Sequence, residues 1–473
     1  MLEPLHRWSR EAPDRIAVAN AKAAWTFRQL VTRADEWARS LREGSVIASV
    51  LPSGPELTAL QLGCWQAGAV FFPLPLRAKA HEHRSSLTTL RPDAIVARAD
   101  DAGAVREALE AAGLDTHLVD PAAPVSLPAT PRVLPADVAM VQLTSGSTGR
   151  PKPIVLDRAA LEAGTRANAT ATAPLAGHAV FSPMPQFHAM GGATVLEHLV
   201  AGASVLVANR FVPGDDRRRM VEHEVRCLVG SPSYFRMLLQ LGLFDGDGLP
   251  ALESVVLGSA SANGELLASL RRADPTLTLR LRYGLSEAFG ALTRLDIAPD
   301  DELPPRGLVG RALPEVELRM VSDEVEARAP SVALGRWDEA LVPLTSDGWL
   351  RTGDVGHVDP RGLHLRGRRT QFIKRQGHRI DPGEIEQVLV GHASVREAVV
   401  LGVTDPVQGQ RIVALVEPVG ELAANVLIRH CRARLTSYKV PQRIHLVDTI
   451  PRTPSGKPDR TAARARVEVE EGT

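Results

Sequence analysis

The chain has 473 residues, 44% of them hydrophobic and 23% charged, which is typical of a soluble globular protein with a sizeable core and more than one domain. Lys plus Arg and Asp plus Glu both number 55, and this zero net charge argues against nucleic acid or an anionic membrane as a partner. Three widely spaced cysteines, Cys64, Cys227 and Cys431, suggest neither a disulfide framework nor a metal site. No apolar run reaches the roughly 18 residues that span a bilayer, and the first residues lack the apolar stretch of a signal peptide, so a cytoplasmic protein is expected.

The first third of the chain alternates helices with short apolar strands, a pattern that predicts a parallel sheet covered by helices. Helices are predicted in residues 1–45, where Thr26 is a candidate N-cap for 27–41, and at 56–69 and 104–112. Strands are predicted at 46–51, 70–74, 94–97 and 117–119. Residues 120–136, rich in Pro and Ala, are expected to be a surface connector.

Residues 143–152, Leu-Thr-Ser-Gly-Ser-Thr-Gly-Arg-Pro-Lys, carry the most informative pattern. They follow a predicted strand at 138–143 that is apolar apart from Gln142. Glycines let backbone N–H groups turn towards an anion, hydroxyl groups donate further hydrogen bonds, and Lys152 supplies a mobile charge, so a polyphosphate-binding loop is predicted. The spacing is not that of a Walker A loop, and the alternative is a solvated turn between two strands.

Strands and helices continue to alternate in the second third of the chain. A helix is predicted at 157–168 with Asp157 as its N-cap, and a second helix ends near Leu199. Strands are predicted at 180–188 (the strand and the turn after it), 204–208, 227–230, 254–257 and 279–283. Several of them end in loops of Gly, Ser, Thr and Glu, and parallel sheets build ligand sites at the carboxyl ends of their strands.

The last third is expected to be β-rich at 307–366 and then to form a separate small domain. Within that domain we predict a helix from Pro382, strands at 398–403 and 411–416, and a helix at 424–435, a βαβ-like run.

Five motifs occur in one order, and together they resemble the acyl-adenylating superfamily of acyl-CoA synthetases, nonribosomal-peptide adenylation domains and luciferases. They are Thr144–Gly149 with Lys152, Tyr283–Glu287 (Y-G-x-[TS]-E), Thr352–Asp354 (T-G-D), Gly367-Arg368 with 373–386, and 451–457 with its lysine. The compact chain is most similar to small acyl- and aryl-CoA ligases.

The resemblance implies an α/β fold. It consists of a large N-terminal domain, residues 1–367, with parallel-sheet αβ subdomains and a β-rich subdomain, and a small mobile α+β C-terminal domain, residues 368–473. It also implies an enzyme that activates a carboxylic acid with ATP and Mg²⁺ as acyl-AMP, releases pyrophosphate, and transfers the acyl group to a thiol. The thiol is expected to be that of CoA. The alternatives are a carrier protein's phosphopantetheine, loaded with an acyl, aryl or β-amino acid, and chemistry without a thiol.

Site residues are carried over from the motifs. The expected catalytic residues are Lys457, Thr144, Glu287 and His188, with Glu287 also as the Mg²⁺ ligand. ATP is expected to contact Thr144, Ser145, Gly146, Ser147, Thr148, Gly149, Lys152, Gly258, Ser259, Ala260, Tyr283, Gly284, Ser286, Asp354 and Arg368. The acid pocket is expected to contain His188, Met190, Gly191, Gly230, Ser231 and Tyr234. Thr370 is expected to be the hinge, and Lys374, Gly377 and His378 belong to the thiol-side loop.

Each of these side chains has a plainer alternative when it is considered without the motifs. Glu287 could stabilise a helix N-terminus, Tyr283 and His188 could be core residues, and Asp354 and Arg368 could belong to a surface turn. Lys457 could be one more surface lysine. A nucleotide-binding protein without activity is disfavoured because the acidic and lysine positions are intact.

Three departures from the family's pattern bear on the reaction. Thr370 stands where the family's hinge usually has Asp or Lys, a departure that bears on the thiol step and not on adenylation. The family's G-E-[LI] motif is reduced to Asp323-Glu-Val325. Peptide-synthetase domains for α-amino acids tend to carry an aspartate near the position of His188 that binds the amino group. No aspartate occurs here between Asp157 and Asp215, which argues against an α-amino acid substrate. A monomer or a homodimer is expected.

Overall fold

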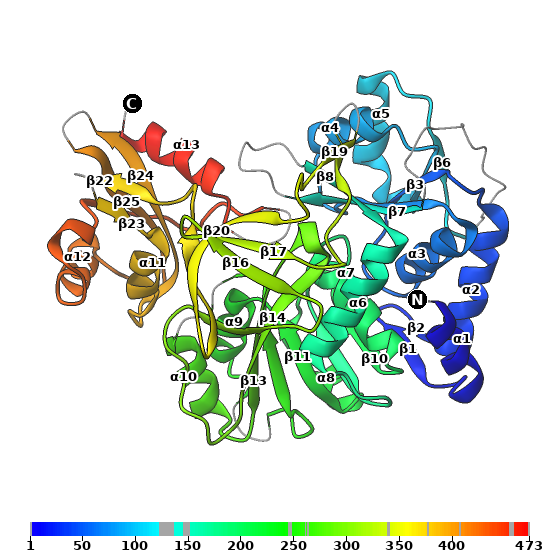
Figure 1. Ribbon diagram of the computed structural model, residues 1–473, viewed down its shortest axis with the longest axis horizontal. Coiled ribbons are helices and arrows are strands. Elements are labelled where there is room, and N and C mark those ends of the chain that lie inside the picture. The colour runs from blue at the N-terminus through cyan, green and yellow to red at the C-terminus, as the bar shows by residue number, and fades with distance from the viewer. Residues whose placement is uncertain are drawn as a thin grey trace. The chain divides into compact units, whose positions relative to one another are not determined.

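The computed structural model describes residues 2–122, 137–144, 152–244, 248–260, 262, 264–337, 341–375, 378–405, 408–453 and 458–471. These residues fall into two compact units. The first unit holds nearly all of the described residues up to Arg351, and the second holds Arg319–Glu326 with Thr352 and the residues after it. Both units combine helices with strands (Figure 1).

The larger sheet of the first unit is parallel through its middle and antiparallel at its edges. Its strands lie in the order β15-β14-β13-β12-β11-β9-β10-β1-β2. Strands from β1 to β13 pair in parallel, whereas β2, β14 and β15 are added antiparallel. The bounds are Ile16–Ala19 (β1), Ala24–Thr26 (β2), Ala179–Ser182 (β9), Ser204–Val207 (β10), Val225–Gly230 (β11), Ser254–Leu257 (β12), Thr278–Leu285 (β13), Gly290–Ile297 (β14) and Leu308–Ala312 (β15).

Both faces of this sheet are buried, because successive side chains of a strand point to opposite faces and each face is covered by helices. Val180 and Val205 belong to one core cluster, together with residues of α6 and α7, whereas the adjoining Phe181 and Leu206 belong to another, with residues of α8, α9 and α10. These helices are Arg158–Thr172 (α6), Ala189–Val200 (α7), Pro213–Glu222 (α8), Pro232–Gln240 (α9) and Gly264–Ala273 (α10).

The second sheet of this unit has the order β19-β18-β8-β7-β4-β3-β5-β6. The strands from β7 to β6 in that order run parallel, and β8 returns antiparallel to β7. The bounds are Val46–Val50 (β3), Val70–Pro73 (β4), Ala94–Ala97 (β5), His117–Val119 (β6), Val138–Thr144 (β7), Lys152–Asp157 (β8), Gly335–Trp337 (β18) and Leu341–Pro343 (β19).

One core cluster joins the two sheets of the first unit. It contains Ile47 of β3, Val205 of β10 and Trp65 of α3 (Pro55–Ala67), and almost every residue of α3 is buried. Burial extends around the helix and includes the polar Thr58 and Gln61, so α3 belongs to the interior. The remaining helices of this part are Leu2–Glu11 (α1), Phe27–Ser40 (α2), Ala80–Leu90 (α4) and Gly103–Ala112 (α5).

The second unit contains a β-rich part and an α+β part. In the β-rich part, β16 (Glu317–Val321), β17 (Glu324–Arg328), β20 (Leu350–Asp359) and β21 (Gly362–Arg368) are neighbours in that order. In the α+β part the strand order is β23-β22-β25-β24, with β26 paired to β25. The bounds are Ile373–Arg375 (β22), His378–Ile380 (β23), Val395–Asp405 (β24), Gly409–Pro418 (β25), Arg443–Leu446 (β26), Pro382–Val390 (α11), Ala424–Arg432 (α12) and Arg460–Glu471 (α13).

The fold class predicted from the sequence is confirmed, including its parallel αβ subdomains, β-rich part and small α+β part. Thr26 and Asp157 cap their helices as predicted. The domain boundary between residues 367 and 368 stays a prediction; both residues lie on β21. None of the helices that the structure describes combines the length and apolar character needed to cross a bilayer.

Two local predictions are wrong. Residues 1–45 are not helical throughout, because β1 and β2 form a hairpin between α1 and α2. The strands β24 and β25 pair antiparallel along their length, so they form a hairpin and not a βαβ-like run.

Candidate functional site

The predicted phosphate loop connects the two strands of the β7–β8 hairpin. Thr144, the last residue of β7, is paired with Lys152, the first residue of β8, and its Oγ1 donates to the Lys152 carbonyl at 3.3 Å. The residues between them, which include the predicted ligands Ser145, Gly146, Ser147, Thr148 and Gly149, lie outside the described residues. The hairpin therefore fixes both ends of the loop in one place.

The turn that precedes α7 carries His188 as the N-cap residue of this helix. Its backbone is held from two sides. Buried Gln186 accepts from the Gly54 N–H at 2.5 Å and donates to Thr58 Oγ1 at 2.8 Å, and Gln142 Nε2 donates to the Phe187 carbonyl at 3.2 Å. The His188 turn is thus tied both to the start of α3 and to the strand that leads into the phosphate loop.

Gly191 lies where no side chain fits. A Cβ there would be 2.1 Å from the Pro185 carbonyl oxygen, so the first turn of α7 packs directly on the backbone of the His188 turn. This close approach gives a physical reason for glycine at position 191.

The strip that follows β12, residues Gly258–Ala260 and called the Gly258 strip below, contacts Met190 and Gly230. The Gly258 N–H donates to the Gly230 carbonyl at 3.1 Å. A Cβ on Gly258 would lie 3.1 Å from Met190 Cε and 3.3 Å from Arg282 Cγ, so these two side chains cover the strip. A Cβ on Gly230 would lie 2.6 Å from Tyr234 Cδ1. The structure therefore brings together four of the predicted pocket and nucleotide residues, along with Arg282.

Two members of the predicted pocket also have structural contacts of their own. Ser231 caps α9, accepting from the Tyr234 N–H at 3.3 Å. Tyr234 packs edge-on against Phe211 and Phe235, and burial, with a further contribution from Asp216, holds the pKa of its hydroxyl well above the usual value.

Ser259, the next residue of the strip, is in the left-handed backbone region with φ of 61°. Its Oγ is buried and finds no hydrogen-bond partner among the described residues, and the same holds for Gln142 Oε1. Strained backbone and unpaired buried polar atoms gather where proteins bind ligands, so these two atoms fit a site that receives a polar molecule.

Strand β13 ends in the Tyr283–Glu287 motif. Tyr283 is buried, and a Cβ on Gly284 would lie 1.8 Å from the Gly290 carbonyl oxygen. Glu287 follows in a short 3₁₀ turn, Ser286–Ala288, where its carbonyl accepts from the Ala333 N–H at 2.8 Å. From the residues that the structure describes, no hydrogen bond or ion pair reaches the half-buried Glu287 carboxylate. A carboxylate in this state is suited to a hard cation such as Mg²⁺.

In the second unit, Asp354 and Arg368 lie opposite each other on β20 and β21. Arg368 Nε donates to Asp354 Oδ1 at 3.0 Å, while the Asp354 N–H donates to Thr352 Oγ1 at 3.0 Å. Asp354 and Arg368, which the T-G-D and G-R motifs predicted to contact ATP, thus form one ion pair.

The predicted hinge residue, Thr370, lies in an exposed turn after β21. Lys374 and His378 lie on the β22–β23 hairpin, where the ring of His378 stacks on that of Tyr438 with 4.2 Å between the centroids. Gly377 and Lys457 lie outside the described residues.

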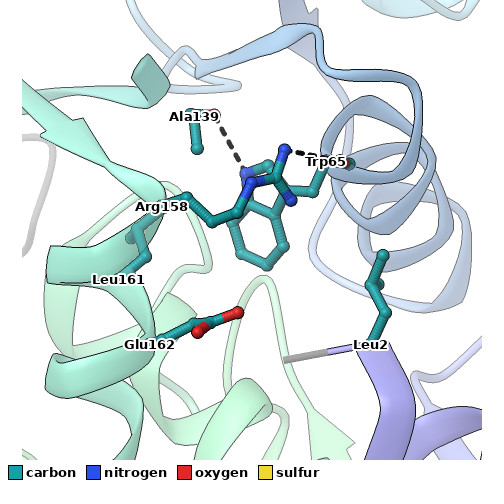
Figure 2. A pocket seen from close by; sticks show the side chains of 6 residues that line it. All are labelled: Leu2, Trp65, Ala139, Arg158, Leu161 and Glu162. Carbon is teal, nitrogen blue, oxygen red and sulfur yellow. Dashed lines mark hydrogen bonds between the residues drawn. The ribbon is translucent and has the colours of Figure 1, made fainter. Parts of the chain in front are cut away.

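One cavity of about 200 Å³ lies elsewhere in the first unit, between α3 and α6, and none of the predicted site residues lines it. Figure 2 shows Trp65 among the residues that line it, with Arg158 donating to the Trp65 carbonyl and the indole N–H donating to the Ala139 carbonyl. Its polar side chains already hold neighbouring elements together, so this cavity is not the candidate site.

Three structural partners of the site were missed in the sequence. Gln142 gave a signal, since a polar side chain within a buried strand must find a partner. Gln186, Arg282 and Glu197 gave no signal in the sequence, because the residues that they bond to are far away in the chain.

Two family profiles match this chain. One, described as AMP-binding enzyme, matches residues 5–335, and the other, described as AMP-binding enzyme C-terminal domain, matches residues 384–457.

The chain is also similar to individual proteins over nearly its whole length. An indoleacetate–CoA ligase of Aromatoleum aromaticum is 28% identical, with 94% of each protein covered. The o-succinylbenzoate CoA synthetase of Bacillus subtilis, solved with its acyl-adenylate intermediate, has the same fold with a TM-score of 0.84, at 22% identity over 98% of this chain and 97% of that one. An amide bond synthetase from Marinactinospora thermotolerans is 26% identical, with a TM-score of 0.80 over 98% of this chain and 100% of that one. The chain therefore belongs to the AMP-binding enzyme family, as its motifs predicted, and is an AMP-forming ligase of the acyl-CoA synthetase type.

Proposed function

We propose that this protein joins a carboxylic acid to AMP with release of pyrophosphate and then transfers the acyl group to the thiol of CoA. The observation that carries the proposal is the grouping at the carboxyl ends of neighbouring strands. There, the Gly258 strip follows β12 beside the Met190 side chain of α7, the buried Tyr283 lies near the end of β13, and the open carboxylate of Glu287 follows that strand. Ligands of open α/β sheets bind at such an edge.

MgATP supplies the α-phosphorus that the acid's carboxylate oxygen attacks, with pyrophosphate as the leaving group. Glu287 would hold the metal, and Thr144 with the glycine- and hydroxyl-rich residues 145–149 and Lys152 would bind the terminal phosphates. Lys457 would neutralise the charge that builds up as the carboxylate and the α-phosphate approach each other. Gly258, Ser259, Ala260, Tyr283, Gly284 and Ser286 are proposed to surround the adenine.

Asp354 and Arg368 are proposed to bind the ribose. A carboxylate accepts hydrogen bonds from both hydroxyl groups of a ribose, and the Arg368 ion pair would orient the carboxylate for this role. Residues 368–473 would then rotate about Thr370, so that Lys374, Gly377 and His378 replace Lys457 for the thiol step.

The acid is proposed to lie against His188, Met190, Gly191, Gly230, Ser231 and Tyr234. Small residues beside an aromatic ring suit a planar aryl or medium-length acyl group, and the indoleacetate–CoA ligase relative supports an aryl acid. Action as a monomer or homodimer in the cytoplasm stays a prediction.

A second candidate is use of the same adenylate without a thiol. The likeness to an amide bond synthetase at 26% identity favours an amine as the other acceptor to test. Loading of a carrier protein is a third possibility of the same chemistry.

The test is pyrophosphate release from MgATP across benzoates, cinnamates, indoleacetate, short and medium fatty acids, o-succinylbenzoate and β-amino acids, with CoA, an amine or no acceptor. Release with one acid that CoA stimulates is expected. Release that ignores CoA and leaves a stable acyl-AMP would favour a carrier or an amine, and no release with any acid would contradict the proposal. Lys457→Ala should lower adenylation at least about a hundredfold, whereas exposed Lys22→Ala should not change it.

A further inference from the structure

An ion pair lies in the interior beneath the proposed acid pocket. Arg282, on β13, donates through one nitrogen to both oxygens of the Glu197 carboxylate, at 3.1 and 3.0 Å, and Glu197 belongs to α7. Arg282 is 8% exposed and Glu197 is not exposed at all. Removing two charges from water costs free energy that their attraction does not fully return, so stability alone is a poor explanation for this pair.

Two threonines complete the network. Thr172, at the end of α6, donates to Glu197 at 2.9 Å and lies 2.9 Å from the same Arg282 nitrogen. The second guanidinium nitrogen of Arg282 donates to Thr194 Oγ1 at 3.2 Å, and that hydroxyl donates to the Met190 carbonyl at 2.8 Å. The guanidinium is therefore linked by two successive hydrogen bonds to the backbone of a pocket residue.

The aliphatic part of Arg282 also reaches the pocket. Its Cγ and the Met190 Cε fill the space beside Gly258, where a Cβ would lie 3.3 and 3.1 Å from them. Arg282 directly precedes Tyr283, and Met190 follows the His188 turn by two residues. One side chain thus contacts the strip under the acyl and adenine positions and, through its charge, holds the start of α7.

We propose that Arg282 is a positioning residue for the acid substrate: paired with Glu197, it fixes Met190 against the Gly258 strip and so sets the width of the acyl pocket. This inference rests on the proposed function. Both terminal nitrogens of this buried guanidinium bond to Glu197, Thr172 and Thr194, so it acts through Met190 and not by binding a charge on the acid.

The test compares R282M, E197Q and the double variant R282M/E197M with the wild type. R282M leaves a carboxylate buried without its partner and should lower the melting temperature, whereas the double variant removes both charges and should restore much of it. The matched control is R226M/E253M, which removes an exposed pair of the same residue types. For each folded variant, KM for the acid, KM for ATP, kcat, and the ranking of the acid panel are measured.

We expect KM for the acid to rise about tenfold in the double variant and the preferred acid to change in size, with KM for ATP within about twofold of wild type. E197Q keeps the shape of the network, so its KM for the acid should lie between that of the wild type and that of the double variant. A stable double variant with wild-type KM and wild-type ranking would overturn the positioning role while leaving the proposed function intact. A wild type that releases no pyrophosphate with any acid would contradict the proposed function, and with it this inference.

Discussion

Arg368 Nε lies 3.0 Å from Asp354 Oδ1, and the two residues face each other on neighbouring antiparallel strands. Asp354 is itself 7% exposed, so the pair presents a carboxylate whose position is set by the sheet. Replacing Asp354 with Asn keeps the shape but weakens the acceptor for ribose hydroxyls. We expect KM for ATP to rise at least about tenfold while KM for the acid stays near wild type. Asp14→Asn, at an exposed ion pair with Arg28, is the control and should change neither value.

Glu287→Gln should raise the Mg²⁺ concentration that half-saturates the reaction by about tenfold or more, because an amide is a weaker ligand for a hard cation than a carboxylate. The measurement is acid-dependent pyrophosphate release against Mg²⁺ concentration at fixed ATP. Glu253→Gln, on the surface, serves as the comparison. An unchanged Mg²⁺ dependence in Glu287→Gln would exclude this carboxylate as the metal ligand.

Gly284→Ala should strongly destabilise the first unit. The added methyl group would lie 1.8 Å from the backbone oxygen of Gly290, inside a paired strand that has no room to shift. We expect a loss of about 3 kcal/mol or more in the free energy of unfolding. Gly214→Ala on α8, where nothing lies within 4 Å, should be neutral or stabilise by about 0.5 kcal/mol. Denaturant unfolding measures the free energy of unfolding of both variants. Equal values would show that the strand at Gly284 can relax.

His83 should make the protein sensitive to mild acid. It is buried on α4, both ring nitrogens lack a hydrogen-bond partner among the described residues, and burial lowers its pKa from 6.5 to about 4. The unfolded chain binds a proton at His83 below about pH 6.5, whereas the folded chain does so only near pH 4. Stability is therefore full above pH 6.5 and falls as the pH drops from there towards 4.

The variant His83→Leu removes this dependence. At pH 5 we expect it to gain about 2 kcal/mol relative to wild type, over and above any difference between the two at pH 8. Urea unfolding at both pH values measures this change. A difference that is the same at pH 5 and pH 8 would show that folding does not change the pKa of His83.

Gln186→Leu should weaken the hold on the His188 turn. The Gly54 N–H would be left buried without its acceptor, which costs about 1–3 kcal/mol. Because the turn leads directly to His188 and Met190, KM for the acid is expected to rise more than KM for ATP. Gln66→Leu, at a hydrogen bond on the surface between α3 and α2, provides the matched change. Loss of stability without any change in KM for the acid would limit Gln186 to a structural role.

The elements that could be predicted from the sequence are those with local signals. Thr26 and Asp157 could be predicted as N-caps because a capping side chain accepts a hydrogen bond from a residue only three positions further on. The buried strands could be recognised because both their faces are apolar. The short strand Ile16–Ala19 was missed because its parallel partner, β10, lies far away in the chain. Helix α4 was missed because its polar sequence buries only one narrow side, which includes Leu87 and Leu90.

In the candidate site, too, some residues could be predicted from the sequence and others could not. Its motif residues were predicted by resemblance, and the structure places Gly258 against Met190 and Asp354 against Arg368. The glutamines and the buried ion pair that hold these residues could not be foreseen, since Gln186 and Thr58 are 128 residues apart and Arg282 and Glu197 are 85 apart.

The parallel pairing of β1 with β10 has a consequence for how the protein is made. Ser204 Oγ bonds to the Ile16 carbonyl across 188 residues, and Val18 faces Val205 in the sheet. During synthesis the apolar strand near the N-terminus therefore leaves the ribosome long before its partner exists. Until then its backbone edge is open to other nascent chains, and folding of the first unit has to wait for most of that unit to be translated. Cells that produce this enzyme in quantity are thus expected to depend on chaperones that bind the nascent chain.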